Sequence, residues 1–279
     1  MLILAATPIG NLSDASPRLI ENLQSAKFIA AEDTRSVLKL ANSLGIKLNA
    51  KIFSLHEHNE SDRIDQILDI ARDSDVLVVS DAGMPTVSDP GFLLVRAAVA
   101  AGIGVSVVPG PSAVLSALAV SGLPTDRFTF EGFLPRKQGD RRKIFQSLVR
   151  EQRTMVFFES PHRILDSLAD AALELGQERQ ASVSRELTKK FEHTERGTLA
   201  KLVEWANSEP KGEMVLVVAG AQEVVASVAD LVDQALGLIA EGTSLKEAVA
   251  EIASANGASK SELYQLVLDA RKAGKQSIG

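Results

Sequence analysis

Hydrophobic runs and polar loops alternate along the first 122 residues of the chain. Each of five short apolar runs ends in small or polar residues, and a segment with apolar residues at helical spacing follows it. The runs are Met1–Ala6, Phe28–Ala31, Lys51–Leu55, Val76–Val79 and Val105–Val108. This alternation predicts a mostly parallel sheet with helices on both faces. The residues that follow the strands are then expected to converge on one edge of the sheet.

The stretch Val76–Gly91 shows this pattern most clearly. Its apolar, largely β-branched run Val76–Val79 is typical of a strand buried on both faces. Small and acidic residues follow at Ser80–Gly83, and Asp89-Pro90 predicts an N-cap and the first residue of a helix. A loop of this kind indicates a ligand site, although an ordinary strand-to-helix connection is the alternative.

Strand and helix patterns resume after residue 122. Thr154–Phe158, Ala181–Ser184 and Met214–Val218 predict further strands, with helical segments between them. We therefore expect an N-terminal α/β domain at residues 1–122 and a second α/β domain at residues 123–222.

Residues 223–279 are expected to form a helical module, because strand patterns end after Gly220. Ser244–Glu247 and Ser259–Glu262 both fit the capping-box pattern, so each predicts the start of a helix. Two helices joined by a turn suggest a helix-turn-helix-like unit. Only Lys260 is basic early in the second helix, which favours a packing or interaction module over DNA-type recognition.

Composition narrows the chemistry. The chain has no cysteine, which excludes disulfides and thiolate chemistry, and its net charge is −6. An acidic total argues against a large polyanionic partner, but local basic clusters can still bind phosphates. The N-terminus lacks a preceding positive charge and is typical of a first strand rather than a secretion signal. With no segment approaching a membrane span, we expect a cytoplasmic protein without a membrane partner.

Several common active-site motifs are missing. The sequence contains no G-x-G-x-x-G fingerprint in the required strand-to-helix context, no Walker motif and no G-x-S-x-G elbow. His56 and His58 with Glu57 and Glu60 have a weak spacing for a metal, so we expect no metal site. Reasoning from single residues thus ends at a ligand crevice between two α/β domains.

A resemblance extends this interpretation. Eight motifs occur in order: Thr7–Asp14, Ala31–Arg35, His56–Asn59, Ser80–Gly91, Val108–Ala113, Phe157–Arg163, Arg185–Glu192 and Gly212–Gly220. Together they resemble the tetrapyrrole methylase family, and within it the branch that methylates a cytidine 2′-hydroxyl of small-subunit (16S) ribosomal RNA. The resemblance implies two α/β domains with S-adenosylmethionine in the cleft between them, the small ribosomal subunit as partner, and a homodimer.

The same resemblance and the strand-end loops supply candidate cofactor residues. The family's Gly-Asp-Pro loop appears here as Ser80–Pro85, which is a departure from its usual form. The candidates for cofactor binding are Pro8, Ser80, Asp81, Gly83, Met84, Pro109, Ser112, Ala113, Phe158, Leu187 and Met214. Phe158 and Met214 could equally be plain core residues.

The RNA substrate needs a group that assists its 2′-hydroxyl and cations that hold its phosphates. Strand-end motifs offer as catalytic candidates Asp33, His58, Glu186 and Lys189. The candidates for RNA binding are Arg35, Arg136, Lys137, Arg141, Arg142, Lys143, Arg163, Arg185 and Lys190. Internal pairs, Asp33 with Arg35 or Arg185 with Glu192, are an alternative to these roles.

Two other functions stay open. A tetrapyrrole C-methyltransferase would use the same fold and cofactor, and a non-catalytic RNA-binding assembly factor could retain the pocket. Motifs in both domains favour an RNA-methylating enzyme over both.

Overall fold

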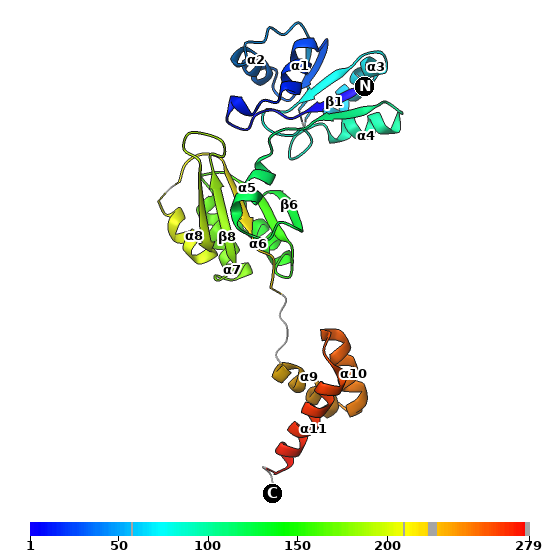
Figure 1. Cartoon of the computed structure of the whole chain (residues 1–279), viewed down its shortest axis with the longest axis vertical. Coiled ribbons are helices and arrows are strands. Elements are labelled where there is room, and N and C mark those ends of the chain that lie inside the picture. Colours follow the sequence, from blue (N-terminus) through cyan, green and yellow to red (C-terminus); the bar gives the residue numbers. More distant parts are fainter. Residues whose placement is uncertain (57, 209, 223–227, 277–279) are drawn as a thin grey trace. The chain divides into compact units, whose positions relative to one another are not determined.

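The computed structural model describes residues 1–56, 58–208, 210–222 and 228–276 (Figure 1). It divides into two compact units, Met1–Ala221 and Gln222–Gly279. The first unit contains both α/β sheets, and the described part of the second contains three helices. None of the helices in the described part of the chain is long and apolar enough to cross a membrane.

The first sheet is parallel throughout, as the alternation of strands and helices predicts. Its strand order is β3-β2-β4-β1-β5. The strands in chain order are β1 (Leu2–Ala5), β2 (Phe28–Ala31), β3 (Lys51–Ser54), β4 (Val76–Val79) and β5 (Val105–Val108).

Helices cover both faces of this sheet, and the central strand β4 shows why. Val76 and Val78 pack in a core with α3 (Glu60–Asp73) and α4 (Phe92–Ala100). Leu77 and Val79 pack in a second core with α1 (Pro17–Ser25) and α2 (Thr34–Ser43). Successive residues of a strand face opposite sides of the sheet, so both faces of β4 are apolar. The prediction of a strand buried on both faces is confirmed. A short 3₁₀ helix, η1 (Leu12–Asp14), precedes α1.

The second sheet is mixed. Its order is β6-β7-β10-β8-β9, with β6 parallel to β7 and the remaining neighbours antiparallel. The strands are β6 (Phe128–Phe133), β7 (Thr154–Glu159), β8 (Gln180–Arg185), β9 (His193–Thr198) and β10 (Met214–Val218). One face packs against α6 (Gln138–Ser147), α7 (Ile164–Leu175) and α8 (Leu199–Ala206).

The other face of the second sheet is covered by α5 (Ala113–Ser121). Val114, Ala117 and Leu118 of this helix pack with Val156 and Val217 of β7 and β10. In Figure 1, α5 accordingly lies beside the second sheet. α5 precedes the predicted boundary at residue 122 in sequence and packs with the second sheet.

The start of α4 corrects another prediction. The sequence predicts Asp89 as N-cap and Pro90 as the first helical residue, but α4 begins at Phe92 with Gly91 as its N-cap. Gly91 has φ +119°, a conformation that favours glycine. The buried Glu60 carboxylate accepts hydrogen bonds from the backbone N–H groups of Gly91 and Leu94, at 3.1 and 2.9 Å. The Glu60 carboxylate from α3 thus caps α4, and Asp89 lies in the loop before the helix instead of capping it.

The second unit contains α9 (Val228–Ala240), α10 (Leu245–Asn256) and α11 (Lys260–Gln276). The capping prediction at Ser244 is confirmed, because its hydroxyl accepts a hydrogen bond from the Glu247 N–H and donates one to the Glu247 carboxylate. The side chains that form the core of this unit are Leu231, Ala235, Val249, Ala253, Leu263 and Val267. Residues 223–227, where the predicted module begins, lie outside the described residues.

Candidate active site

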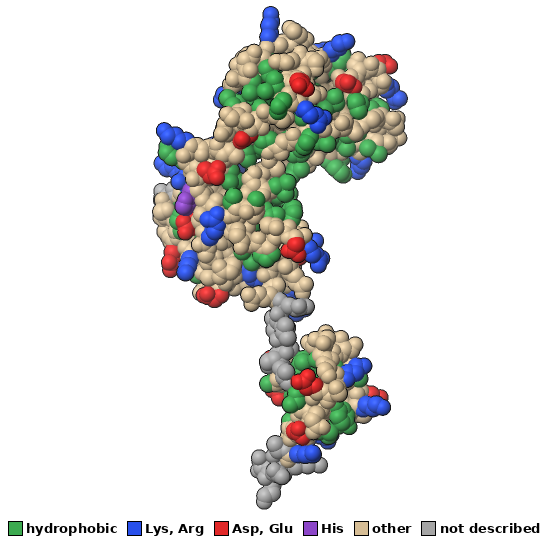
Figure 2. All heavy atoms as spheres, viewed as in Figure 1, with side chains coloured by type: hydrophobic (Ala, Val, Ile, Leu, Met, Phe, Trp, Pro, Cys, Tyr) green, Lys and Arg blue, Asp and Glu red, His purple; other side chains and the backbone are tan. Residues whose placement is uncertain are grey.

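A pocket of ≈ 360 Å³ lies in the first unit, where loops that follow strands of both sheets meet. The first sheet contributes residues after β1, β2, β4 and β5. The second contributes the ends of β6 and β7, a residue after β8 and the start of β10. The residues that line it are Ile9, Glu32, Asp81–Ser88 without Pro85 and Thr86, Asp89, Ser112–Val114, Phe133, Phe158–Pro161, Leu187 and Glu213–Val215. Figure 2 shows hydrophobic side chains gathered where the two α/β halves meet.

The second sheet supplies an apolar wall. Phe158 lies opposite Val215 in the antiparallel pairing of β7 with β10, and both side chains line the pocket. Phe133 contacts Phe158 edge to face, with ring centroids 5.3 Å apart, and stays 61% exposed. A large exposed aromatic ring beside an apolar pocket is suited to covering a flat ligand.

The first sheet supplies a tightly folded loop after β4. Gly83 exchanges both backbone hydrogen bonds with Thr7, at 2.9 and 3.1 Å, and has φ +80°. Thr86 and Ser88 also have positive φ, at +77° and +62°. Residues other than glycine in this conformation are strained by roughly 1–3 kcal/mol each, and such strain clusters at ligand sites.

Carboxylates gather on the first-sheet side of the pocket. The Asp81 N–H donates to Glu32 Oε2 at 3.2 Å, and the Asp33 N–H donates to Asp81 Oδ1 at 3.2 Å. Burial raises the pKa of Glu32 above its usual range. Burial also raises the pKa of Asp89 to about 6; a hydrogen bond from Ser80 opposes this rise, and the charges of Glu32 and Asp81 add to it. This side of the pocket would therefore be stabilised by a cation.

Asp89→Asn is expected to raise the free energy of unfolding by about 1–2 kcal/mol at pH 8, after discounting for solvent screening. The folded state binds the Asp89 proton more tightly than the unfolded state does, because the pKa of Asp89 in the unfolded chain is near 3.8. The charged form therefore destabilises the fold above about pH 6, and this penalty disappears as the pH falls towards 3.8. Urea unfolding of both proteins from pH 4 to 8 measures the difference.

Asp33→Asn is the matched control, and its effect has the opposite sign. Hydrogen bonds from Arg35 lower the pKa of Asp33 to about 2. The ionised Asp33 thus contributes stability above pH 3.8 that is lost as the pH falls towards 2, and its replacement destabilises at neutral pH. An Asp89→Asn effect that stays constant between pH 4 and 8 would contradict the raised pKa.

A second polar cluster lies on the other side of the pocket. Lys189 Nζ contacts Glu186 Oε1 at 3.1 Å and Glu213 Oε2 at 2.9 Å, and Glu213 lines the pocket. Burial lowers the pKa of Lys189, but the hydrogen bonds to Glu213 and Glu186 outweigh burial and raise the pKa above its usual value. The hydrogen bond from Lys189 lowers the pKa of Glu186. Both side chains are therefore charged at neutral pH.

The loop after β1 joins the two α/β halves at this cluster. The Asn11 N–H donates to Thr188 Oγ1 at 3.1 Å. A Cβ atom at Gly10 would lie 2.6 Å from Lys189 Cγ and 2.8 Å from Thr188 Oγ1, so only glycine allows this close approach. The contact holds Lys189 against the first half of the unit.

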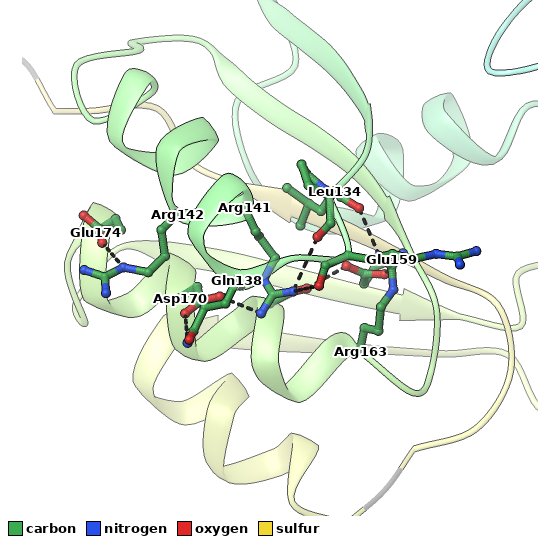
Figure 3. A network of polar contacts seen from close by, with 11 residues as sticks. Leu134, Gln138, Arg141, Arg142, Glu159, Arg163, Asp170 and Glu174 are labelled. Atoms are coloured by element: carbon green, nitrogen blue, oxygen red, sulfur yellow. Dashed lines mark hydrogen bonds and ion pairs between the residues drawn. The ribbon is translucent and has the colours of Figure 1, made fainter.

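Beneath the pocket, a network of polar contacts holds the loop after β7 (Figure 3). Glu159 lines the pocket, is 2% exposed, and pairs with Arg163 at 2.6 Å. Its carboxylate also accepts hydrogen bonds from the Ser167 hydroxyl and the Ser160 N–H, at 2.6 and 2.7 Å. Arg163 further donates to the Leu134 carbonyl oxygen at 3.0 Å. Arg163 therefore positions this wall, which differs from its predicted contact with an RNA phosphate.

Arg141 also differs from its predicted role. Its side chain is 3% exposed and pairs with Asp170 at 2.7 Å. Figure 3 shows the two side chains pointing toward one another. The prediction of an RNA contact is wrong for Arg141, because its guanidinium lies in the core. Arg142 pairs with Glu174 at 2.5 Å and is 40% exposed.

The other predicted RNA-binding cations lie nearer the surface. Arg35 has 88% of its side chain exposed and pairs with Asp33 at 2.6 Å, so this predicted internal pair is confirmed. Arg136, Lys137, Lys143 and Lys190 are exposed. Arg185 is half-buried and does not pair with Glu192, whose carboxylate accepts the Thr188 N–H instead.

Most of the predicted cofactor residues line the pocket. Those that do are Asp81, Gly83, Met84, Ser112, Ala113, Phe158, Leu187 and Met214. Pro8, Ser80 and Pro109 do not: Ile9 lines the pocket beside Pro8, and Ser80 is buried behind Gly83.

Sequence reasoning missed part of the pocket and named residues outside it. Glu32, Asp89 and Glu213 line the pocket without having been predicted to do so. The acidic residues Glu32 and Asp33 follow β2 directly. Their place at a strand end could have indicated that Glu32 lines the pocket. The catalytic candidates lie at different distances from the pocket. Asp33 contacts Asp81, a pocket residue, while both Glu186 and Lys189 contact Glu213. His58 is exposed and does not line the pocket.

No group of three or more His, Asp or Glu side chains in the described residues could hold a metal ion; Glu57 lies outside them.

Comparison with known proteins decides the family. Residues 1–203 match the family described as Tetrapyrrole (Corrin/Porphyrin) Methylases. The chain belongs to the tetrapyrrole methylase family. Residues 225–272 match the RsmI C-terminal HTH domain. Among the most similar relatives is ribosomal RNA small subunit methyltransferase I of Mycobacterium tuberculosis, 47% identical over 97% of this chain and 95% of the relative.

Two solved structures of methyltransferases are similar in fold. The methyltransferase CobJ covers 79% of this chain and 94% of its own, with a TM-score of 0.59 and 20% identity. Uroporphyrin-III C-methyltransferase from Thermus thermophilus, complexed with S-adenyl homocysteine, covers 78% of this chain and 96% of its own. Its TM-score is 0.51 and its identity 19%.

Proposed function

We propose that the chain transfers a methyl group from S-adenosylmethionine to the ribose 2′-hydroxyl of a cytidine in small-subunit (16S) ribosomal RNA. The observation that carries this proposal is the pocket between the two sheets, which joins an apolar wall to a group of carboxylates. The 47% identity to a ribosomal RNA small subunit methyltransferase supports the RNA substrate. The sequence motifs that resemble the 2′-O-methylating branch support the position of methylation.

The pocket fits the proposed cofactor. S-adenosylmethionine combines a flat adenine with a sulfonium cation and, when bound, supplies the electrophilic methyl group. Phe158, Leu187 and Met214 offer the apolar surface that an adenosyl group requires. Glu32, Asp81 and Asp89 offer negative charge for the cationic end. Burial raises the pKa of Glu32 and of Asp89, so a bound cation would stabilise their charged forms.

The ionisation of the candidate catalytic residues favours positioning over proton abstraction. A general base works best with a pKa near the operating pH. The lowered pKa values of Asp33 and Glu186 make both poor bases at neutral pH. Lys189 carries a positive charge beside Glu213 at the pocket, and it would stabilise negative charge that develops on the 2′-oxygen. We assign Lys189 this role, and the two glutamates hold its ammonium group in place.

Cations at the surface would hold the RNA. With Arg141 and Arg163 occupied within the protein, the proposed phosphate contacts are Arg35, Arg136, Lys137, Arg142, Lys143, Arg185 and Lys190. Because phosphate contacts release counterions, affinity is expected to fall steeply with salt. We further propose a cytoplasmic homodimer. Strand β5 lies at the edge of the first sheet, and its Val107 is 47% exposed. A second copy of the chain that covers this edge would bury Val107, which supports the dimer.

Methyl transfer from tritiated S-adenosylmethionine tests the proposal. The substrates are small ribosomal subunits, free ribosomal RNA and tetrapyrrole precursors, followed by digestion of the RNA to nucleosides. We expect label in 2′-O-methylcytidine. Lys189→Met should lower kcat by about 10²-fold or more, in the range for loss of one electrostatic donor. Lys190→Met is the matched comparison, since Lys190 is exposed and adjacent in sequence. As a proposed phosphate contact, its loss should raise KM for the RNA and leave kcat unchanged.

Two outcomes would refute the proposed function. Label only in tetrapyrrole would establish a C-methyltransferase, whose fold the chain shares. Binding of RNA without label in any substrate would establish a non-catalytic assembly factor.

A further inference from the structure

A second hollow of ≈ 440 Å³ opens on the second sheet, and none of the residues that line it lines the first pocket. Its lining residues come from the end of β8, the start of β9, α8 and the segment before β10. They are Arg185, His193, Trp205, Ser208, Pro210 and Lys211. The proposed methyl transfer assigns no role to His193, Trp205 or Lys211.

Two aromatic rings form one side of this hollow. His193 and Trp205 stack with ring centroids 6.5 Å apart and an angle of 29° between their planes. Trp205 is half-buried and packs against the core of the second sheet, which fixes its ring. His193 has 48% of its side chain exposed and contacts Glu195 at 3.0 Å, so its ring is also held in place. Rigid aromatic faces of this kind are typical stacking surfaces for bases.

Two cations complete the hollow. Arg185 is half-buried and donates to the Lys211 carbonyl oxygen at 3.5 Å, while the Lys211 side chain is exposed. The hydrogen bond joins the end of β8 to the segment before β10, so both cations stand beside the aromatic rings. Arginine and lysine beside stacking rings are the combination by which proteins bind single-stranded nucleic acid.

The hollow is also close to the first pocket. Arg185 is the direct partner of Met214 in the antiparallel pairing of β8 with β10, and Met214 lines the first pocket. Directly opposed residues of antiparallel strands have Cβ atoms about 5 Å apart. Leu187, two residues beyond Arg185, lines the first pocket as well. An RNA strand whose target ribose lies at the first pocket could therefore place a neighbouring nucleotide in the second.

We propose that this hollow binds a nucleotide next to the target cytidine, with its base stacked on Trp205 and His193 and its phosphate held by Arg185 and Lys211. The proposal rests on the proposed function and specifies its substrate: the target lies in an unpaired segment of RNA, since a paired base could not stack here. Glu195 restricts where the phosphate can lie. Its carboxylate beside His193 repels a phosphate there, so the phosphate is expected beside Arg185 and Lys211.

Fluorescence of the full-length chain provides a direct test. Trp205 is the single tryptophan of the sequence, so tryptophan fluorescence, excited at a wavelength that Tyr264 does not absorb, reports on this hollow alone. A cytidine-containing tetraribonucleotide, titrated without cofactor, is expected to quench that fluorescence. Binding of the same oligonucleotide, labelled for anisotropy, should weaken about 5- to 150-fold in Trp205→Leu, the range for losing one base–aromatic stack.

Matched variants separate stacking from charge and from misfolding. Trp205→Phe keeps an aromatic face and should retain most of the affinity. Phe92→Leu removes an aromatic ring that is 60% exposed on α4 and should leave affinity unchanged. Arg185→Gln with Lys211→Gln should weaken binding and reduce the dependence of log affinity on log salt by about 1–2. Thermal unfolding of each variant establishes that it is folded.

The outcomes distinguish this inference from the proposed function. If tetraribonucleotide leaves the fluorescence unchanged, or if Trp205→Leu binds as the unmodified chain does, the hollow is not a nucleotide site, even where methyl transfer to ribosomal RNA occurs. If fluorescence is quenched by a polyglutamate peptide and not by RNA, the hollow binds an acidic protein segment and the inference is overturned. If quenching and its loss in Trp205→Leu are found without methyl transfer, the inference stands and the catalytic proposal fails.

Discussion

Replacing Asp170 with alanine is expected to lower the free energy of unfolding by about 3–5 kcal/mol, the usual result of removing one partner from a buried ion pair. Asp170 and Arg141 are each 3% exposed, and they pair at 2.7 Å. Gln138 also donates to Asp170 at 3.0 Å. Without Asp170, the guanidinium of Arg141 stays in the core with hydrogen bonds to the carbonyl oxygens of Pro135 and Arg136 alone. The uncompensated charge accounts for most of the loss.

Thermal unfolding followed by circular dichroism gives the measurement. For a unit of this size, such a loss lowers Tm by about 6–20 °C. Glu174→Ala is the matched control on the same helix α7. It breaks the pair with Arg142, whose side chain is 40% exposed, and should lower Tm far less than Asp170→Ala does. Equal losses in the two variants would mean that water reaches Arg141 and that the pair is not a buried one.

Arg141 shows where sequence reasoning about this chain fails. Arg141 belongs to the basic segment Arg136–Lys143, which is typical of a solvated surface patch, and it was predicted to contact RNA. Its partner Asp170 lies on another helix, 29 residues further along the chain. Nothing local in the sequence distinguishes it from its exposed neighbour Lys143, because the difference arises only from the packing of α6 against α7.

The first sheet was predictable for a physical reason. All of its strands were predicted from apolar runs, and β4 is buried over its whole length. The edge strand β9 was missed, because its sequence HTERGT is polar and it is paired on one side only. β6 and α6 were missed as well: β6 has no fully buried residue, and α6 buries only Arg141 and Phe145. Elements at the edge of a sheet or on its surface carry little hydrophobic periodicity, so their sequences do not identify them.

The candidate site was predictable where it depends on the backbone. Residues at the ends of parallel strands meet at one edge, which placed Asp81, Gly83 and Ser112 correctly around the pocket. Asp89 was predicted to cap a helix, and instead it lies in the pocket because Glu60 from α3 caps α4. A cap supplied by another helix leaves no pattern in the local sequence. The raised pKa of Asp89 likewise results from burial near Glu32 and Asp81, which is a tertiary effect.

Ala113→Phe is expected to weaken the binding of S-adenosylmethionine by at least about 100-fold, which corresponds to about 2.7 kcal/mol. Ala113 is the first residue of α5 and lines the pocket beside Ser112 and Val114. Its neighbours on the second sheet are buried and close-packed, so an added aromatic ring has space only in the pocket. The ring would occupy part of the ≈ 360 Å³ that the adenosyl group needs. Isothermal titration calorimetry with the cofactor measures the loss.

Leu115→Phe is the matched control, because Leu115 lies on the same helix, is 55% exposed and does not line the pocket. It should bind the cofactor as the unmodified chain does. Thermal unfolding shows whether each variant folds, and the fluorescence response of Trp205 to tetraribonucleotide should persist in Ala113→Phe, since the second hollow is lined by other residues. Unchanged cofactor affinity in a folded Ala113→Phe variant would place the cofactor outside this pocket. Loss of both cofactor and RNA binding would instead indicate that the substitution disturbs the packing of α5 on the second sheet, because α5 contacts β8, β9 and β10.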